Sequence, residues 1–140
     1  VAHGVPAAQE GRIEGNIGRD PRNRLRMTVV PPPAGKPAAT RYRVIRRFGD
    51  IASLLECRLE TGRTHQIRAH LAHLGHPLLG DGLYRGRRGH RFAAAPSIGR
   101  QALHAAMLGF RHPVTGTDMM FESPLPADMN ALLEALERHY

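Results

Sequence analysis

Apolar and polar residues alternate along residues 40–60, and this alternation predicts a β-hairpin with one buried face and one charged face. Ile45 and Arg46 interrupt the alternation once. The pair Gly49-Asp50 is compatible with the turn between the two strands. The predicted buried face carries Tyr42, Val44, Phe48, Ile51, Leu55, Cys57 and Leu59, and the predicted charged face carries Arg41, Arg43, Arg47, Glu56, Arg58 and Glu60.

The spacing of apolar residues becomes helical after Thr64. Ile67, Leu71 and Leu74 recur at intervals of four and three residues, which places them on one face of a helix. Gly75, followed closely by a proline, supplies the usual signal for a helix C-terminus. The sequence therefore predicts a short amphipathic helix directly after the hairpin.

The other segments complete a predicted α+β fold. Residues 26–30 read as a short strand, the proline-rich residues 31–39 as an extended connector, and the glycine- and arginine-rich residues 85–100 as a mobile basic loop. Two further strands are predicted around residues 112–116, and a second helix after Pro126. The order of these elements predicts a mixed, largely antiparallel sheet with flanking helices. The apolar stripe of the second helix holds Met129, Leu132, Leu133, Leu136 and Tyr140.

The composition is that of a globular protein with one domain or part of one. The chain has 140 residues, of which 41% are hydrophobic and 23% charged. No stretch approaches the ~20 continuous apolar residues of a membrane span, and the first residues lack a secretory signal pattern. Cys57 is the only cysteine, so an internal disulfide is excluded. We expect a cytoplasmic protein without a membrane partner.

The charge indicates a polyanionic partner. The formal net charge is +8, and because Lys36 is the only lysine among 20 basic residues, 19 are arginines. Residues 112–140 hold five acidic residues and one basic residue, so residues 1–111 carry the other seven acidic and 19 basic residues. Arginine presents a planar fork of donors that suits phosphate and base edges. The alternative is a genome that simply prefers arginine over lysine on solvated surfaces.

Arg68 is the candidate for a specific ion pair. It lies about 100° around the predicted helix from Ile67, at the edge of the apolar stripe, so we expect it to be partly buried. A partly buried guanidinium needs a carboxylate or phosphate partner. Arg63, His65 and Gln66 fall in the first turn, where free N–H groups and the helix dipole favour an anion. An ion pair that only stabilises the fold remains an alternative for Arg68.

The histidines raise the alternative of a zinc-dependent enzyme. His70, His73 and His76 are three residues apart, and Asp81 follows them. The segment lacks a His-Glu-x-x-His arrangement and a cysteine partner, and Gly75 separates His76 from the helix. We therefore predict no metal site and expect the histidines to face RNA or solvent.

Residues 59–84, LETGRTHQIRAHLAHLGHPLLGDGLY, closely resemble the signature of the RluA-type RNA pseudouridine synthases. Residues 10–27 (EGRIEGNIGRDPRNRLRM), 35–44 (GKPAATRYRV) and 101–129 (QALHAAMLGFRHPVTGTDMMFESPLPADM) resemble other segments of that family, in the same order and at its spacing. The resemblance implies part of a pseudouridine synthase catalytic domain. It also implies an isomerase of uridines in ribosomal or transfer RNA that needs neither a metal nor a cofactor.

The resemblance also implies roles for individual residues. In that family an aspartate in a His-Arg-Leu-Asp segment is the nucleophile, a tyrosine contacts the base, and the second arginine of a Gly-Arg-Thr-His-Gln-Ile-Arg motif pairs with the aspartate. That arginine is Arg68, which we predict to be catalytic. The residues predicted to bind RNA are Arg19, Lys36, Arg63, His65 and Gln66.

The chain departs from the family pattern because it contains no His-Arg-Leu-Asp segment. We therefore expect residues 1–140 to be the C-terminal part of a single catalytic domain that supplies Arg68 to an aspartate outside this chain. Alone, such a part would be inactive, would leave Arg68 without its partner and would expose unpaired strand edges. The alternative is a non-catalytic RNA-binding module, such as a degenerate paralogue.

Overall fold

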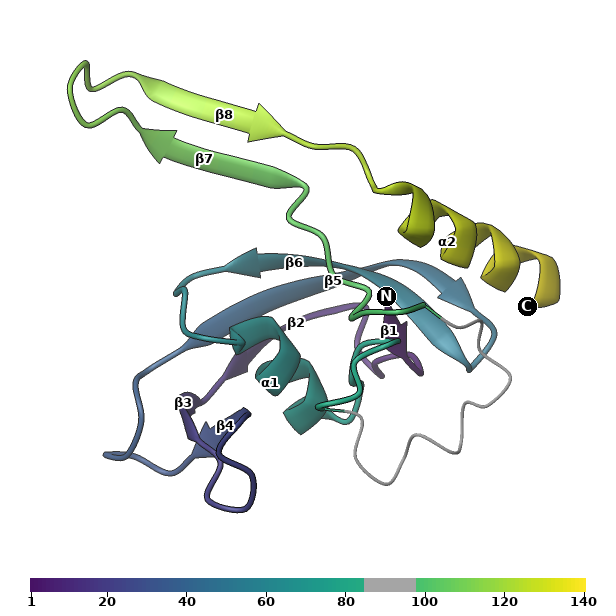
Figure 1. The fold of residues 1–140 in the computed structure, drawn as a ribbon, viewed down its shortest axis with the longest axis horizontal. Helices are drawn as coiled ribbons and strands as arrows, with labels where there is room; N and C mark the ends of the chain where they lie inside the picture. The colour runs from purple at the N-terminus through teal and green to yellow at the C-terminus, as the bar shows by residue number, and fades with distance from the viewer. Residues whose placement is uncertain (85–97) are drawn as a thin grey trace.

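The computed structural model describes residues 1–84 and 98–140, so most of the predicted basic loop at 85–100 lies outside the described residues. The described part is an α+β fold, as predicted (Figure 1). Its strands and helices are, in chain order, β1 (Ala2–His3), β2 (Glu10–Glu14), β3 (Asn16–Arg19), β4 (Met27–Val30), β5 (Ala39–Phe48), β6 (Ala52–Leu59), α1 (Gln66–Leu74), β7 (Met107–Arg111), β8 (Asp118–Glu122) and α2 (Ala127–His139).

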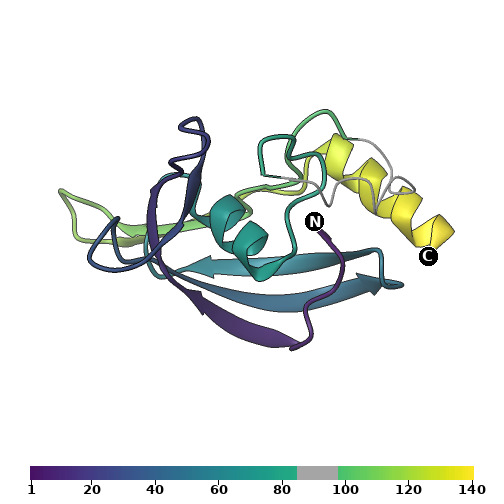
Figure 2. The ribbon, with the colours of Figure 1, turned by 90° about the horizontal axis from the view of Figure 1, so that it is seen from below.

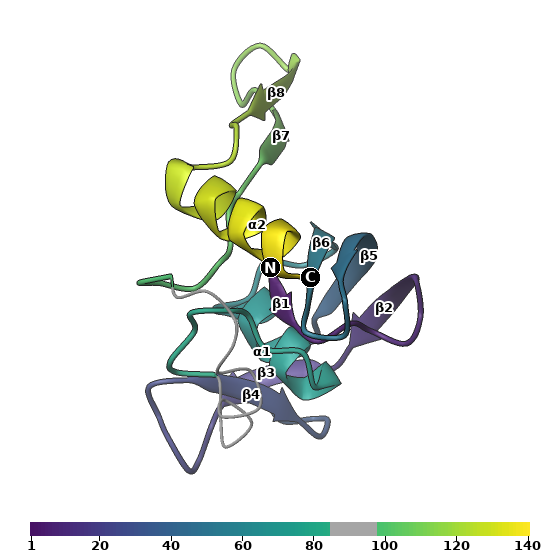
Figure 3. The same cartoon turned by 90° about the vertical axis from the view of Figure 1, so that its right-hand side faces the viewer.

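The main sheet has the strand order β1-β6-β5-β2, and all its neighbouring strands are antiparallel. Helix α1 packs on this sheet, and the two-stranded β3–β4 ribbon lies beside the helix (Figure 2). Helix α2 lies over the turn end of the β5–β6 hairpin (Figure 1). The β7–β8 hairpin projects away from the main sheet in two perpendicular views (Figures 1 and 3).

The predicted hairpin at residues 40–60 is confirmed as β5–β6. Tyr42 faces Cys57 across the two strands, and the register shifts between Val44 and Arg46, where the sequence alternation breaks. At this β-bulge, β5 contains one extra residue, Ile45, that has no partner in β6. The first predicted helix is confirmed as α1, and the second as α2.

Three clusters of apolar side chains form the core. One lies under α2 and includes Phe48, Leu79 and Leu136. A second lies between the main sheet and α1 and includes Tyr42 and Leu71. The third joins α1 to the β3–β4 ribbon and consists of Ile17, Ala38, Ala69 and Tyr84. The segment after α1 thus connects the clusters, because Leu78, Leu79 and Tyr84 belong to different ones.

Three positions predicted to be buried are exposed instead. The exposed fractions are 52% for Leu59, 39% for Leu74 and 42% for Tyr140. Leu59 and Leu74 are the last residues of β6 and α1, and Tyr140 follows the last residue of α2. The apolar periodicity extends to the end of each element, whereas the core clusters stop short of these ends.

The β7–β8 hairpin is confirmed as two strands, but one of its faces is apolar and uncovered. Leu108 pairs with Phe121 and Phe110 with Met119, so these four side chains share one face of the ribbon. We call them the hairpin apolar face. Leu108, Phe110 and Phe121 are 60%, 43% and 50% exposed. The rings of Phe110 and Phe121 stack with their centroids 5.8 Å apart.

Neither helix within residues 1–84 and 98–140 is long and apolar enough to cross a membrane.

Candidate functional site

Arg68 lies on α1 and makes a two-point ion pair with Asp81. The Nε and Nη2 atoms of Arg68 donate to the two carboxylate oxygens of Asp81, at 2.8 and 2.9 Å. The side chains of Arg68 and Asp81 are 15% and 1% exposed. The hydrogen bonds to Asp81 raise the pKa of Arg68, so the guanidinium stays charged. Arg68 therefore has a carboxylate partner within this chain, as its position at the edge of the apolar stripe predicts. Asp81 does not lie in a His-Arg-Leu-Asp segment, so the expectation that the nucleophilic aspartate lies outside this chain stays a prediction.

A tight turn between the core and the site places Asp81. The N–H of Leu79 donates to the carbonyl of Val1 at 3.0 Å, and the N–H of Asp81 to the carbonyl of Leu78 at 3.3 Å. Gly80 between them has φ +74°, and a Cβ atom at this position would lie 2.0 Å from the carbonyl oxygen of Arg100. Only glycine fits such a position. The turn therefore fixes Asp81 under α1 through contacts from β1 and from residues near position 100.

The Arg68 guanidinium also lies over an aromatic ring. Its Cζ atom is 4.8 Å from the centroid of the Tyr84 ring, which is within the range of a cation–π interaction. The edge formed by Nε and Nη2 is occupied by Asp81. Within the described residues, Nη1 of Arg68 makes no hydrogen bond. Arg68 is thus held by one edge and one face, and it retains a donor for a second anion.

The Tyr84 hydroxyl connects the β3–β4 ribbon to the start of α1. It accepts the N–H of Met27 and lies near Nδ1 of His65, both at 2.8 Å. Burial and the charge of Arg68 lower the pKa of His65 below its ordinary value of 6.5, so its imidazole is neutral at pH 7. Because the hydroxyl already accepts from Met27, we assign its proton to a hydrogen bond with Nδ1 of His65.

His65 itself has an unusual backbone conformation. Its φ is +53°, and it is the only non-glycine residue with a positive φ in the described part of the chain. Such a conformation costs energy for a residue with a Cβ and persists where surrounding contacts hold it. His65 directly precedes α1, which begins at Gln66, close to the start that the sequence predicts. The contact with Tyr84 is one of those that hold the residue in place.

The tip of the β3–β4 ribbon is basic and lies beside this site. Arg19, Arg22 and Arg24 are exposed, and none of them forms an ion pair within residues 1–84 and 98–140. Arg26 instead pairs with Asp20 at 2.6 Å and donates to the carbonyl of Leu83 at 3.3 Å. Arg19 is close enough to His65 for its charge to lower the pKa of that histidine. We call Arg19, Arg22 and Arg24 the basic tip.

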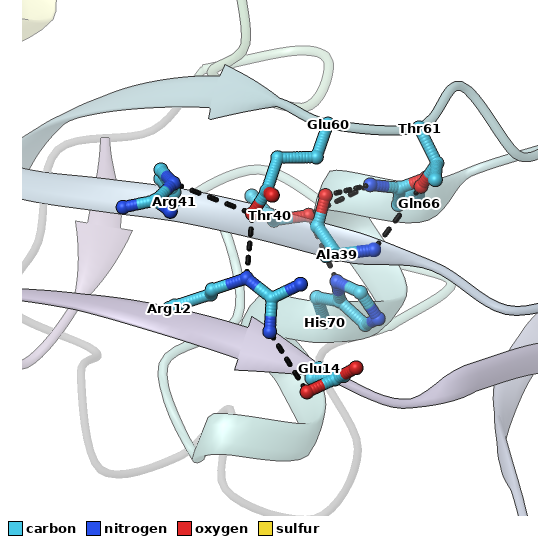
Figure 4. A network of polar contacts seen from close by, with 9 residues as sticks. All are labelled: Arg12, Glu14, Ala39, Thr40, Arg41, Glu60, Thr61, Gln66 and His70. Atoms are coloured by element: carbon cyan, nitrogen blue, oxygen red, sulfur yellow. Dashed lines mark hydrogen bonds and ion pairs between the residues drawn. The ribbon is translucent and has the colours of Figure 1, made fainter.

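Four arginines on the outer face of the main sheet form ion pairs, unlike those of the basic tip. Glu60 pairs with Arg12 at 2.6 Å and with Arg41 at 3.3 Å. Glu56 pairs with Arg43 and Arg58, both at 3.3 Å. A shallow depression of about 480 Å³ on this face is lined by acidic and basic groups, among them Arg12, Arg41, Arg43, Glu56 and Arg58. Figure 4 shows the Arg12 and Arg41 part of this network.

Gln66, which the sequence predicts to contact RNA, has a buried side chain. Gln66 is 3% exposed. Its Nε2 donates to Thr40 Oγ1 at 3.0 Å and to the carbonyl of Ala39 at 2.9 Å, and its Oε1 accepts from Thr61 Oγ1 and the N–H of Arg63 (Figure 4). All hydrogen-bonding groups of this amide serve to connect α1 with β5 and with the loop before the helix.

Histidine 70 also faces the core rather than RNA or solvent. His70 is 0% exposed, with Nδ1 2.8 Å from Thr40 Oγ1 and Nε2 3.0 Å from the carbonyl of Gly15 (Figure 4). Of the two other histidines in this row, His73 is exposed. The Nδ1 atom of His76 lies 2.9 Å from the carbonyl oxygen of His3. No group of three or more possible metal ligands converges among the described residues.

Of the four other residues predicted to contact RNA, only some lie close to one another in the structure. Arg63 is half-buried and donates through Nε to the carbonyl of Pro37 at 2.9 Å. Lys36 is exposed, and its backbone pairs with Ile17 in the middle of β3. Arg19 and Arg68 both lie near enough to His65 for their charges to lower its pKa. The RNA contacts of Arg19, Lys36, Arg63 and His65 remain predictions.

Asp81 and Tyr84 belong to the site, and the sequence analysis assigned neither of them to Arg68. The signal was present in the sequence as Gly-Asp-Gly-Leu-Tyr at residues 80–84, directly after the helix. An aspartate that follows the end of a helix, such as Asp81, is also common in ordinary turns without a functional role. Their convergence on Arg68 depends on how the chain folds back under α1, which periodicity does not show.

Comparisons with known proteins agree with this fold. A family model for RNA pseudouridylate synthase matches residues 1–73. An uncharacterized RNA pseudouridine synthase of Chloroflexus aurantiacus is 54% identical over 129 residues, which are 92% of this chain and 38% of that protein. A ribosomal large subunit pseudouridine synthase D of Nitrosomonas europaea is 50% identical over 131 residues, which are 91% of this chain and 37% of that protein.

A solved structure has the same fold. Human RNA pseudouridylate synthase domain containing 1 superposes with a TM-score of 0.71 and 26% sequence identity, over 97% of this chain and 62% of that chain. The chain therefore aligns over nearly its whole length with proteins that are longer. It spans about two fifths of the length of the curated relatives it matches, which is 38% of the Chloroflexus protein and 37% of the Nitrosomonas protein.

Proposed function

The chain belongs to the RNA pseudouridylate synthase family, and we propose that it forms the C-terminal part of a catalytic domain that converts uridine to pseudouridine in RNA. In this isomerisation the bond between N1 of uracil and C1′ of the ribose breaks, and a bond between C5 and C1′ forms. The base loses a proton from C5 and gains one at N1, so the atoms balance. Within this chain, Arg68 is the residue proposed to act at the reacting centre.

The observation that carries this proposal is the unused donor of Arg68. Asp81 occupies Nε and Nη2, whereas Nη1 makes no hydrogen bond in the described part of the chain. In the proposed complete domain, Nη1 would pair with the carboxylate of the nucleophilic aspartate. A positive charge at hydrogen-bonding distance keeps a carboxylate ionised and oriented, as a nucleophile requires. No observation on the described residues favours a non-catalytic module.

The hairpin apolar face supports the proposal that the domain extends beyond this chain. An isolated two-stranded ribbon is marginally stable in water, and its face would gain from contact with another apolar surface. Leu108, Phe110 and Phe121 are all more than 40% exposed, at 60%, 43% and 50%. The matched relatives are more than twice as long as this chain. We propose that the part of the domain outside this chain covers this face.

We propose ribosomal RNA as the substrate class, ahead of transfer RNA. Several matched relatives are named ribosomal large subunit pseudouridine synthase D. A cytoplasmic location is part of the same proposal. Burial raises the pKa of the Cys57 thiol to about 11, which keeps it protonated and unreactive.

The function is tested by tritium release from RNA labelled at C5 of uracil. The 140-residue chain is compared with a longer chain that extends upstream through a His-Arg-Leu-Asp segment of the same coding sequence. Release by the longer chain alone is expected. Release by the 140-residue chain would contradict the proposed division of the site between two parts of the domain. RNA binding without release by either chain would contradict the proposed activity and favour a binding module.

The basic tip is expected to contact phosphates, and the salt dependence of RNA binding measures this contact. Replacing Arg19, Arg22 and Arg24 with glutamine removes up to three phosphate contacts. The slope of log K against log salt should become shallower by about 2–3, because each contact with RNA releases roughly 0.7–0.9 counterion. Binding of a labelled ribosomal RNA fragment between 50 and 200 mM salt would be measured by fluorescence anisotropy.

The outer face of the main sheet provides the matched control for this measurement. Arg41, Arg43 and Arg58 are exposed arginines as well, but each is paired with Glu56 or Glu60. Replacing these three with glutamine changes the net charge by the same amount. The slope should stay near that of the unmodified chain. Equal changes in both variants would show that RNA responds to the net charge alone, without a preference for the tip.

A further inference from the structure

Two side chains to which the proposed reaction assigns no part, Asp81 and Tyr84, enclose the guanidinium of Arg68. We propose that Asp81 and Tyr84 are positioning residues of the synthase site, which hold Arg68 by one edge and one face so that Nη1 points to an anionic group. This inference rests on the proposed function for the identity of that group. Neither residue would contact RNA or the reacting atoms. Both would act through Arg68.

The geometry of the ion pair favours a positioning role. Two parallel hydrogen bonds, 2.8 and 2.9 Å long, fix the plane of the guanidinium as well as its distance from Asp81. A single hydrogen bond would leave the plane free to rotate. Because the plane is fixed by the Nε and Nη2 edge, the direction of Nη1 is fixed too. Asp81 is itself 2% exposed, so solvent competes little for its oxygen atoms.

The support under Asp81 is rigid. Leu78 and Leu79, which precede the turn, are 2% and 1% exposed and belong to two different core clusters. The positive φ of Gly80 and its close approach to the carbonyl of Arg100 leave the turn little freedom. A functional side chain is positioned well when its partner is itself locked by packing. The carboxylate of Asp81 therefore has a fixed place relative to both core clusters.

Tyr84 fixes the second side of Arg68 and links it to the basic tip. Its ring lies 4.8 Å below Cζ of Arg68, and its hydroxyl contacts Met27 of β4 and His65 at the start of α1. Tyr84 is 6% exposed and packs in the cluster that joins α1 to the β3–β4 ribbon. If RNA binding moved the β3–β4 ribbon, the Tyr84 side chain would therefore transmit the movement to Arg68.

A second ion pair in the same chain, between Arg100 and Asp128, offers a comparison with the pair of Arg68 and Asp81. Arg100 donates through Nε and Nη2 to Asp128 at 2.9 and 3.0 Å, which is the same two-point geometry. These side chains are 39% and 45% exposed, and no aromatic ring covers the guanidinium among the described residues. Asp128→Asn is therefore the matched control for Asp81→Asn.

The test combines a kinetic measurement with one that does not depend on activity. Asp81→Asn places an amide N–H₂ against a donor of Arg68 and removes the negative charge, while the volume stays the same. In the longer chain, kcat for tritium release should fall roughly 10- to 100-fold, with KM within about twofold, because misplacing a reacting group by about 1 Å costs on this order. Asp81→Glu keeps the charge and should recover part of the rate. Asp128→Asn should leave both constants unchanged.

The second measurement follows the Nε–H of Arg68 by NMR in the 140-residue chain. Its signal should exchange slowly with water in the unmodified chain and in Asp128→Asn, and it should be lost by fast exchange in Asp81→Asn. Tyr84→Phe keeps the ring and should retain the signal, whereas Tyr84→Leu should broaden it. A folded Asp81→Asn variant with an unchanged Arg68 signal and an unchanged kcat would overturn the inference.

The two proposals fail in different ways. If the unmodified longer chain releases no tritium, the proposed function is contradicted, and the NMR comparison still decides whether Asp81 and Tyr84 position Arg68. If it releases tritium and Asp81→Asn behaves like Asp128→Asn in both measurements, the function stands and the positioning role is wrong.

Discussion

Replacing Arg68 with alanine is expected to abolish tritium release by the longer chain and to lower the free energy of unfolding by about 3–5 kcal/mol. The activity is lost because no donor remains for the proposed nucleophile. The stability is lost because the carboxylate of Asp81, 1% exposed, would be left buried without a counterion. Urea unfolding of the 140-residue chain, followed by circular dichroism, measures the second effect.

A double variant separates the two effects of Arg68. Replacing a buried ion pair by apolar residues of similar volume is often neutral for stability, so Arg68→Met combined with Asp81→Leu should regain most of the lost free energy. It should remain inactive. A double variant that is stable and still releases tritium would contradict the proposed role of Arg68. An Arg68→Ala variant that unfolds like the unmodified chain would show that water reaches Asp81.

Replacing Phe48 with alanine is expected to lower the free energy of unfolding by about 3–5 kcal/mol. Phe48 is 2% exposed, and its ring fills the cluster under α2 that also holds Leu79, two residues before Asp81. Its loss leaves a cavity that the packed neighbours close only in part. Urea unfolding measures the loss. The Nε–H of Arg68 should also exchange faster with water than in the unmodified chain, because Leu79 supports the turn that carries Asp81.

Phe110 on β7 is the matched control for Phe48. Both are phenylalanines near the ends of strands, but Phe110 is 43% exposed. Phe110→Ala should change the free energy of unfolding of the 140-residue chain by less than about 1 kcal/mol, because a large part of the residue, 43%, is already exposed to water. A large loss would show that the hairpin apolar face is covered in solution, and it would contradict the uncovered face described here.

Local sequence patterns predicted the β5–β6 hairpin and helix α1 correctly. The alternation in residues 40–60 predicted β5–β6, and its one interruption matched the bulge between Val44 and Arg46. Helical spacing predicted α1, and Gly75 ends it with a φ of +97°. These features depend on residues within one strand or a few helical turns of each other, so the sequence alone contains the necessary information.

The functional site was predicted in part. The position of Arg68 at the edge of an apolar stripe indicated a carboxylate partner, and the structure provides one. The same reasoning placed Gln66 in an anion site, although its amide is used entirely inside the protein. Helical position shows how far a side chain lies from the apolar stripe. It does not show which strand or loop packs against it.

The sequence by itself determined the basic character and the family of this protein and its elements from β4 onward, because period, charge and motif spacing are properties of the linear chain. It did not predict the strands β1, β2 and β3. Only the tertiary structure decided which side chains meet. Tyr84 reaches Met27 over 57 residues, and His70 reaches Gly15 over 55. It also decided that Phe48 is buried and Phe110 is exposed. Such contacts depend on the folded path of the whole chain, which no local pattern records.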